Sequence, residues 1–227
     1  MKQFFIGTVF SIIVFSGLLA QDKPVLLTKN FKFKDGIFLS FEDFRTNSPS
    51  YSWEELEFSL FANPQTFITK VESIRKLDGT AIDLEKVWGL SIDGIPHIRL
   101  EKGALSDDLY VFVSMKVRGK LCYFSYQDAK TEMVTIKAYN PLTKKPFREG
   151  KVPREVDVVI EKMLNFQTGE LMDFTVDNFI DAIEKDDKKL VNTIQDLSPE
   201  EARQKLFKCL LIYVDRNQVF INESVED

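Results

Sequence analysis

The feature that most constrains the fold is a pair of β-forming runs on either side of Asp93-Gly94 in "VWGLSIDGIPHIRLE". Asp-Gly between such runs favours a two-residue turn in which both residues adopt positive φ. Residues 87–92 and 95–101 are therefore predicted to pair as an antiparallel hairpin. Pro96 has no amide hydrogen, which predicts an edge position or a bulge for the second run.

Further β-forming runs lie close together in the chain. In residues 66–74 apolar and polar side chains alternate, as in a half-buried strand. Residues 156–174 are predicted to form a second hairpin around Thr168-Gly169. Three more runs, "LYVFVSMKV", "KLCYFSYQ" and "MVTIKAY", are separated by Arg118-Gly119 and by "DAKTE". Consecutive strands with short connections form an antiparallel meander.

Helical signals are few, and most come late in the chain. Ser40 and Asp43 predict a capping box for a short helix that ends at Arg45. The periodicity becomes helical over residues 177–216, where Asp177 is the first expected cap and "SPEEARQ" opens the last helix. The predicted fold class is α+β: an antiparallel, β-rich meander with short helices and a C-terminal helical segment packed on the sheet.

Residues 141–154, "PLTKKPFREGKVPR", contain three prolines and five basic residues, which predicts a loop or linker within one domain spanning 21–227. The basic side chains are the weak anion-binding candidates of the sequence: Lys144, Lys145, Arg148, Lys151 and Arg154. They are suited to a phosphate or sulfate on a lipid or glycan. The alternative interpretation is a solvated linker.

The first twenty residues predict export. A single charge at Lys2 precedes an apolar run from Phe4 to Ala20, as in a secretory signal peptide cleaved before Gln21. The alternative is a retained anchor helix, because the run is just long enough to cross a bilayer. No later run is long enough to span a membrane. The expected location is the periplasm, the outer envelope or the extracellular space.

Cys122 and Cys209 are the two cysteines, and an exported chain meets an oxidising compartment in which they can pair. Both lie on largely apolar faces, and free cysteines are among the most buried residues. Two separate core thiols are favoured over a disulfide. One histidine and two distant thiols also make a poor zinc site.

The search for catalytic chemistry assigns no catalytic, cofactor-binding or metal-ligating residue, and no cofactor is implied. His97 is the single histidine, and its strand alternation predicts an exposed imidazole without a catalytic role. Asp173, Asp177 and Asp181 recur every four residues but lack the glycine and glutamate of a calcium loop.

Other polar and aromatic patterns also have structural interpretations. Four acidic pairs occur where helix starts and loops are predicted: Glu54-Glu55, Asp107-Asp108, Asp186-Asp187 and Glu200-Glu201. Acids favour such positions because of the helix dipole and solvent. Trp53 and Trp88 can stack on a carbohydrate, although aromatic residues in strands usually belong to the core. The net charge of −5 disfavours nucleic acid as a partner.

Three stretches of the chain form a recognisable set of motifs: "DGIFLSFEDFRTNSPS", "VWGLSIDGIPHI" and "MLNFQTGELMDFTVDNFIDAIEKDDKKL". Together they resemble a group of secreted Bacteroidota proteins of unknown function. The first is similar to the opening of these proteins, and the second to their Trp-Gly strand and tight turn, although His97 stands where tyrosine is usual. The third resembles the hairpin and helical tail that end many of them. The resemblance implies an exported protein of a Gram-negative envelope and carries over no catalytic residue.

The sequence thus predicts an exported, non-catalytic binding or envelope-associated protein whose partner is an envelope component or a glycan. The alternative is an exported hydrolase with a carboxylate-based site assembled from scattered residues. A cleft with two buried carboxylates favours the hydrolase.

Overall fold

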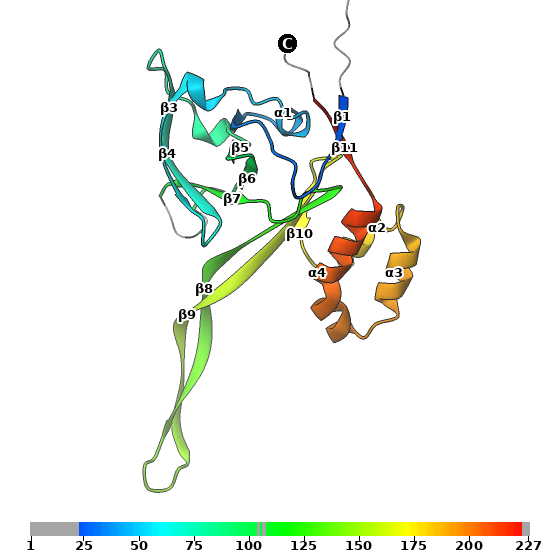
Figure 1. The fold of residues 1–227 in the computed structure, drawn as a ribbon. Helices are drawn as coiled ribbons and strands as arrows, with labels where there is room; N and C mark the ends of the chain where they lie inside the picture. The colour runs from blue at the N-terminus through cyan, green and yellow to red at the C-terminus, as the bar shows by residue number, and fades with distance from the viewer. Residues whose placement is uncertain (1–22, 104, 106–107, 224–227) are drawn as a thin grey trace, which may run out of the picture.

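The computed structural model describes residues 23–103, 105 and 108–223 (Figure 1). The predicted signal peptide, residues 1–20, lies outside the described residues. The strands are β1 (Lys23–Leu26), β2 (Gly36–Phe38), β3 (Leu56–Asn63), β4 (Ile68–Lys76), β5 (Gly89–Ile92), β6 (Ile95–Arg99), β7 (Tyr110–Ser114), β8 (Leu121–Tyr139), β9 (Pro146–Asn165), β10 (Leu171–Asp173) and β11 (Phe220–Glu223). The helices are α1 (Phe41–Arg45), α2 (Val176–Ile183), α3 (Lys188–Gln195) and α4 (Pro199–Arg216), with 3₁₀ turns η1 (Trp53–Glu55) and η2 (Leu84–Lys86).

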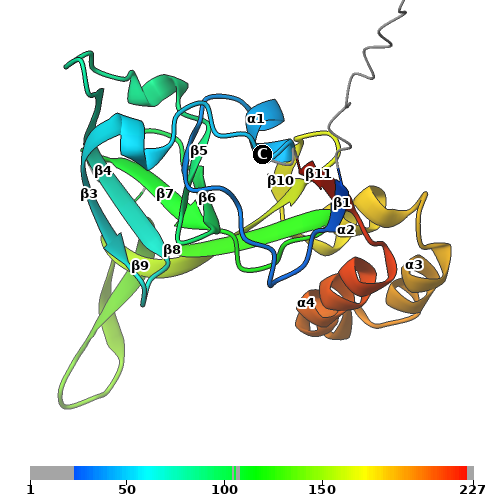
Figure 2. The same ribbon diagram turned by 45° about the horizontal axis from the view of Figure 1, so that its top comes forward.

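The main sheet has six antiparallel strands in the order β2-β5-β6-β7-β4-β3 and is curled into a half-barrel (Figure 2). The β5–β6 hairpin is confirmed: Asp93 and Gly94 have φ of 55° and 76°. The edge position predicted from Pro96 is wrong, because β6 lies between β5 and β7. The Pro96 carbonyl accepts a hydrogen bond from Met115, just past the end of β7, so pairing stops where the proline lacks its donor.

Both faces of this sheet are covered. The concave-face cluster joins the edge strands β2 and β3 and consists of Ile37, Leu56, Val71, Ile74, Leu84, Val87, Leu90 and Phe112. The convex-face cluster consists of Leu27, Phe31, Phe33, Phe38, Phe44, Ile98, Leu100, Val111, Val113, Met115, Cys122, Phe124, Leu164, Phe166 and Ile221. Successive residues of the inner strands alternate between the two clusters, as a strand buried on both faces requires.

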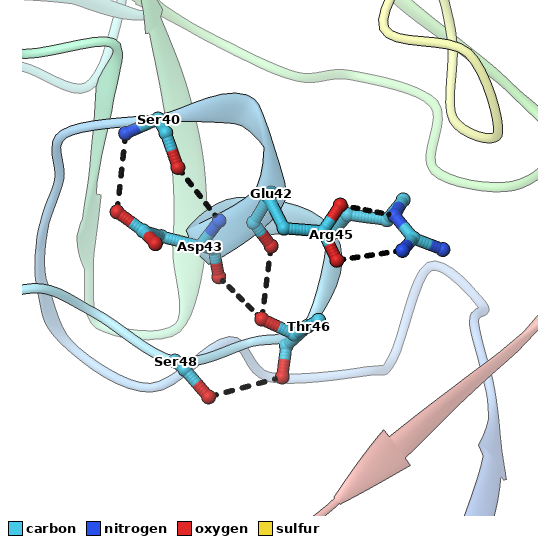
Figure 3. A network of polar contacts seen from close by, with 6 residues as sticks. All are labelled: Ser40, Glu42, Asp43, Arg45, Thr46 and Ser48. Carbon is cyan, nitrogen blue, oxygen red and sulfur yellow. Dashed lines mark hydrogen bonds and ion pairs between the residues drawn. The ribbon is translucent and has the colours of Figure 1, made fainter.

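Helix α1 contributes Phe44 to the convex-face cluster. The predicted capping box is confirmed (Figure 3): Ser40 Oγ accepts from the Asp43 amide, and Asp43 Oδ2 accepts from the Ser40 amide, both at 3.1 Å. The capped turn places Phe44 between the rings of Phe33 and Trp88, with centroid distances of 4.8 Å to each. Much of "DGIFLSFEDF" therefore serves to build this aromatic contact.

The base of the β8–β9 hairpin forms a middle layer. Cys122, Phe124 and Leu164 pack into the convex-face cluster, whereas Leu121 and Tyr123 face the helices. The helical cluster consists of Val117, Leu121, Tyr123, Met163, Phe174, Phe179, Ile183, Leu190, Val191, Ile194, Ala202, Leu206, Cys209, Leu210 and Tyr213. The predicted fold class is confirmed, with the C-terminal helices packed on this layer (Figure 1).

The residues that cap the helices are those predicted from the sequence, with one exception. Ser198 caps α4 and Pro199 is its first residue, as predicted, and Glu201 also completes a capping box with Ser198. The expected cap Asp177 is wrong: Thr175 Oγ1 accepts from the Asn178 amide and caps α2, and Asp177 lies in the first turn. Threonine and aspartate are both good caps, so the residue type alone did not distinguish the two positions.

Cys122 and Cys209 are both free and buried, and they lie in different clusters. The prediction of two separate core thiols is confirmed. Burial raises the pKa of Cys122 to about 11, so this thiol stays protonated and unreactive at neutral pH.

The distal part of β8 and β9 projects from the body as a two-stranded arm (Figure 1). The loop predicted over "DAKTE" is wrong, because the strands pair from Leu121↔Asn165 to Tyr139↔Pro146. The loop predicted over residues 141–154 is confirmed only for residues 141–145, which form the turn, whereas residues 146–154 belong to β9. Both strands of an isolated ribbon are edge strands, which tolerate proline and charged residues that a central strand excludes. This explains how a proline-rich, basic segment forms a strand.

Candidate functional site

The candidate site is a cavity of about 520 Å³ at one end of the half-barrel, here called the mouth pocket. Its lining residues are Ala62, Asn63, Pro64, Phe67, Thr69, Ile92, Asp93, Ile95, His97, Ser114, Met115, Lys116 and Arg118. They come from the concave face of β3, β4, β5, β6 and β7 and from the adjoining turns. A cavity of this size at the mouth of a barrel is a common form of small-molecule site.

The strand register explains why the cavity lies at this end. Thr69 is opposite Phe112 and Ala62 is opposite Thr69, so these residues share the concave face. Towards one end the face is filled by large side chains such as Leu56 and Ile74. Towards the other end it carries Ala62, Thr69 and Ser114, whose small side chains leave the space unfilled.

His97 lies inside this end of the half-barrel. It is 8% exposed, so the predicted exposed imidazole is wrong. The alternation of β6 was assigned correctly, with Ile98 in the convex-face cluster, but the opposite face is also covered. His97 is paired with Ser114 on β7, which places both side chains next to each other on the concave face.

The imidazole of His97 is neutral at physiological pH. Burial lowers its pKa to about 4, although a backbone hydrogen bond opposes the shift. Nδ1 lies 2.9 Å from the carbonyl oxygen of Ile95. Because a carbonyl accepts, Nδ1 carries the proton and Nε2 presents a lone pair. Thr69 adds a buried hydroxyl that has no hydrogen-bond partner.

Two cations border the mouth pocket, and neither forms an ion pair with a described carboxylate. Lys116 Nζ contacts Ser125 Oγ at 2.7 Å and lies 5.2 Å from the centre of the Phe67 ring. Arg118 donates to the carbonyls of Phe31 and Lys29, at 2.9 and 2.5 Å, and its Nε has no partner. This edge of the pocket is therefore suited to an anion.

Phe67 belongs to one of three hairpin turns with a common construction. In each turn, an asparagine Oδ1 accepts from the amides of the second and third following residues; the asparagines are Asn63, Asn140 and Asn165. The fourth following residue donates its amide to the asparagine carbonyl and has positive φ. These residues are Phe67 (61°), Lys144 (55°) and Gly169 (77°).

Phenylalanine is an unfavourable choice for such a position. A side chain with positive φ costs roughly 1–2 kcal/mol, whereas glycine at the equivalent position of the third turn avoids the cost. The Phe67 ring is 47% exposed and borders both the mouth pocket and a neighbouring hollow near Tyr126. Strained residues concentrate at functional sites, which supports a role for this ring at the entrance.

The sequence-predicted candidates lie elsewhere. Lys144 and Lys145 are in the turn at the tip of the arm, and Arg148, Lys151 and Arg154 are on β9; none lines the mouth pocket. Trp88 stacks in the aromatic core, and Trp53 Nε1 donates to the Ser91 carbonyl at 2.7 Å. Among the described residues, no Asp or Glu is buried, and no His, Cys, Asp and Glu cluster is suited to a metal ion.

The sequence alone does not identify most residues of the mouth pocket, because their proximity depends on strand register and on the curvature of the sheet. The repeated pattern Asn-x-x-Thr in residues 63–66, 140–143 and 165–168 is a local signal for the positive-φ position that follows it, which Phe67 and Lys144 occupy in place of glycine. No comparable signal marks Thr69, Ser114 or Arg118.

No family model, curated protein or solved structure matches the chain. The resemblance to secreted Bacteroidota proteins therefore stays a prediction based on the residues that carry it. Within the described part of the chain, no helix has both the length and the apolar character needed to cross a membrane.

The neutral state of His97 predicts a pH dependence of stability. Between the unperturbed pKa of 6.5 and the folded-state value of about 4, the unfolded chain binds a proton that the folded chain does not. The free energy of unfolding therefore falls as the pH drops through this window, by about 3 kcal/mol in all, with no contribution above it. Urea titrations at about pH 7 and about pH 4.5 measure how much free energy of unfolding is lost between the two pH values. His97→Gln should lose roughly 2 kcal/mol less than the parent does. Parallel losses would contradict a buried, neutral imidazole.

Backbone strain at Phe67 predicts an unusual order of stability. Phe67→Gly and Phe67→Ala both remove the ring, but only glycine relieves the positive φ. Phe67→Gly should have the higher free energy of unfolding, by about 1 kcal/mol, in chemical denaturation. If Phe67→Ala is as stable as Phe67→Gly, the turn is not strained.

Proposed function

We propose that the protein is a binding protein whose mouth pocket holds a small, mostly apolar molecule with an anionic end. The observation that carries the proposal is the composition of the wall. Apolar side chains such as Ile92, Ile95 and Met115 surround a few polar groups, and two cations that form no ion pair with a described carboxylate lie at one edge. Such a wall suits an amphipathic ligand.

The polar groups favour recognition over simple partitioning of an apolar molecule. His97 Nε2 accepts a hydrogen bond, and the nearby Ser114 hydroxyl both donates and accepts. A buried hydroxyl without a partner, as at Thr69, lowers stability unless a ligand or water pairs with it. These features support a ligand with at least one hydrogen-bonding group inside the pocket.

The hydrolase alternative has less support. A carboxylate mechanism needs two carboxyl groups held in a cleft, and Asp93 is the one carboxylate among the described lining residues. Asp93 is exposed, in the β5–β6 turn. Export, and an envelope component as the source of the ligand, remain proposals that rest on the first twenty residues.

Displacement of anilinonaphthalene sulfonate by dodecanoate, kept below its micelle concentration, tests the proposal on the chain from Gln21 onwards. Ala62→Trp fills the pocket, whereas the matched control Phe61→Trp places the same ring on the outer face of β3. We expect Ala62→Trp to weaken dodecanoate binding about tenfold or more, because the indole overpacks the cavity that the ligand would occupy. Phe61→Trp should bind dodecanoate as the parent does.

A second comparison tests the cationic edge. Dodecanol has the same chain length as dodecanoate but no charge, and we expect it to bind about tenfold more weakly. Lys116→Gln should reduce this preference. Equal binding by the parent, Ala62→Trp and Phe61→Trp would overturn the assignment of the pocket.

A further inference from the structure

The distal arm is a two-stranded ribbon that projects away from the rest of the described protein (Figure 1). Its turn is ordered by Asn140, whose Oδ1 accepts from Leu142 and Thr143 and whose backbone pairs with Lys144 and Lys145. Beyond residue 128, each strand continues for about ten residues, which corresponds to roughly 30 Å. The tip is therefore held far from the body, as Figure 1 shows.

The tip exposes large apolar side chains that the arm has no means of burying. Leu142 is 91% exposed and Phe147 is 70% exposed. Ile136 and Tyr139 on β8 are also exposed, at 54% and 55%. A two-stranded ribbon is only marginally stable in water. Apolar groups gathered at its end indicate contact with another surface.

The same tip is basic in an acidic protein. Residues 137–151 contain five basic side chains and one acidic one, within a chain of net charge −5. Lys137 pairs with Glu149 at 2.9 Å. Lys144, Lys145, Arg148 and Lys151 have no described acidic partner.

We propose that the arm tip docks on an anionic lipid surface. Leu142 and Phe147 enter the headgroup layer, and the neighbouring lysines and Arg148 contact lipid phosphates. Apolar insertion and cationic attraction together are what peripheral attachment to anionic lipid requires. The length of the arm also fits this partner, because it keeps the acidic body several Debye lengths from the lipid charge.

The experiment measures sedimentation of the chain from Gln21 onwards with vesicles of phosphatidylcholine alone, or of phosphatidylcholine and phosphatidylglycerol in equal parts. We expect binding to the mixed vesicles, weakened by salt, and little binding to phosphatidylcholine alone. Phe147→Trp adds an indole at the tip, and its emission should shift to the blue with the mixed vesicles.

Two tip variants separate the contributions. Lys144→Glu with Lys145→Glu should weaken binding about tenfold or more, because each basic residue contributes several-fold at an anionic surface. The matched control, Lys188→Glu with Lys189→Glu, changes another exposed tandem lysine pair, on α3, and should bind as the parent does. Leu142→Ser with Phe147→Ser should also weaken binding, whereas Leu77→Ser, at another exposed leucine, should not.

Binding that is absent, or that both tip variants leave unchanged, would overturn the proposal. If the parent does not bind vesicles but binds an acidic protein, and Lys144→Glu with Lys145→Glu abolishes that binding, the tip is a docking site for a protein instead. The tip variants lie far from the hydrophobic clusters, and an unchanged thermal transition confirms that they and the control variants fold. Displacement of the probe from the mouth pocket should be the same in all of them, so this proposal and the proposed function fail independently.

Discussion

The structure depends on the burial of both faces of one curled sheet. The convex face packs on the base of β8 and β9 and on the aromatic residues around Phe44, while the concave face closes on itself. Large side chains fill one end of the concave face, and small ones occupy the other. The mouth pocket is thus a consequence of side-chain size along the strands of the curled sheet.

Several features around the mouth pocket reduce stability. His97 is buried, the Thr69 hydroxyl is unpaired, and Phe67 adopts positive φ where the turn at Gly169 has glycine. Each costs free energy that a protein selected for folding alone would avoid. Their convergence on one cavity gives the binding proposal its physical basis.

Features set by neighbouring residues could be predicted from the sequence. The Asp93-Gly94 turn and the Ser40 and Ser198 caps were predicted because each depends on backbone needs within a few residues. The arm could not be predicted from the sequence. A segment rich in proline and basic residues predicts a loop, unless it is already known that its strands form an isolated ribbon with solvent on both faces. His97 was placed on the correct face of its strand, but the sequence gives no sign that the sheet curls over that face.

Hydrogen exchange of the chain from Gln21 onwards, with and without dodecanoate, tests most directly whether the unfilled end of the half-barrel is the binding site. The account predicts added protection for amides in residues 62–69, 92–97 and 114–118, which border the mouth pocket. The arm tip and helices α2, α3 and α4 should exchange as before. Saturable binding that protects the helices or the tip and leaves the three pocket segments unchanged would contradict it.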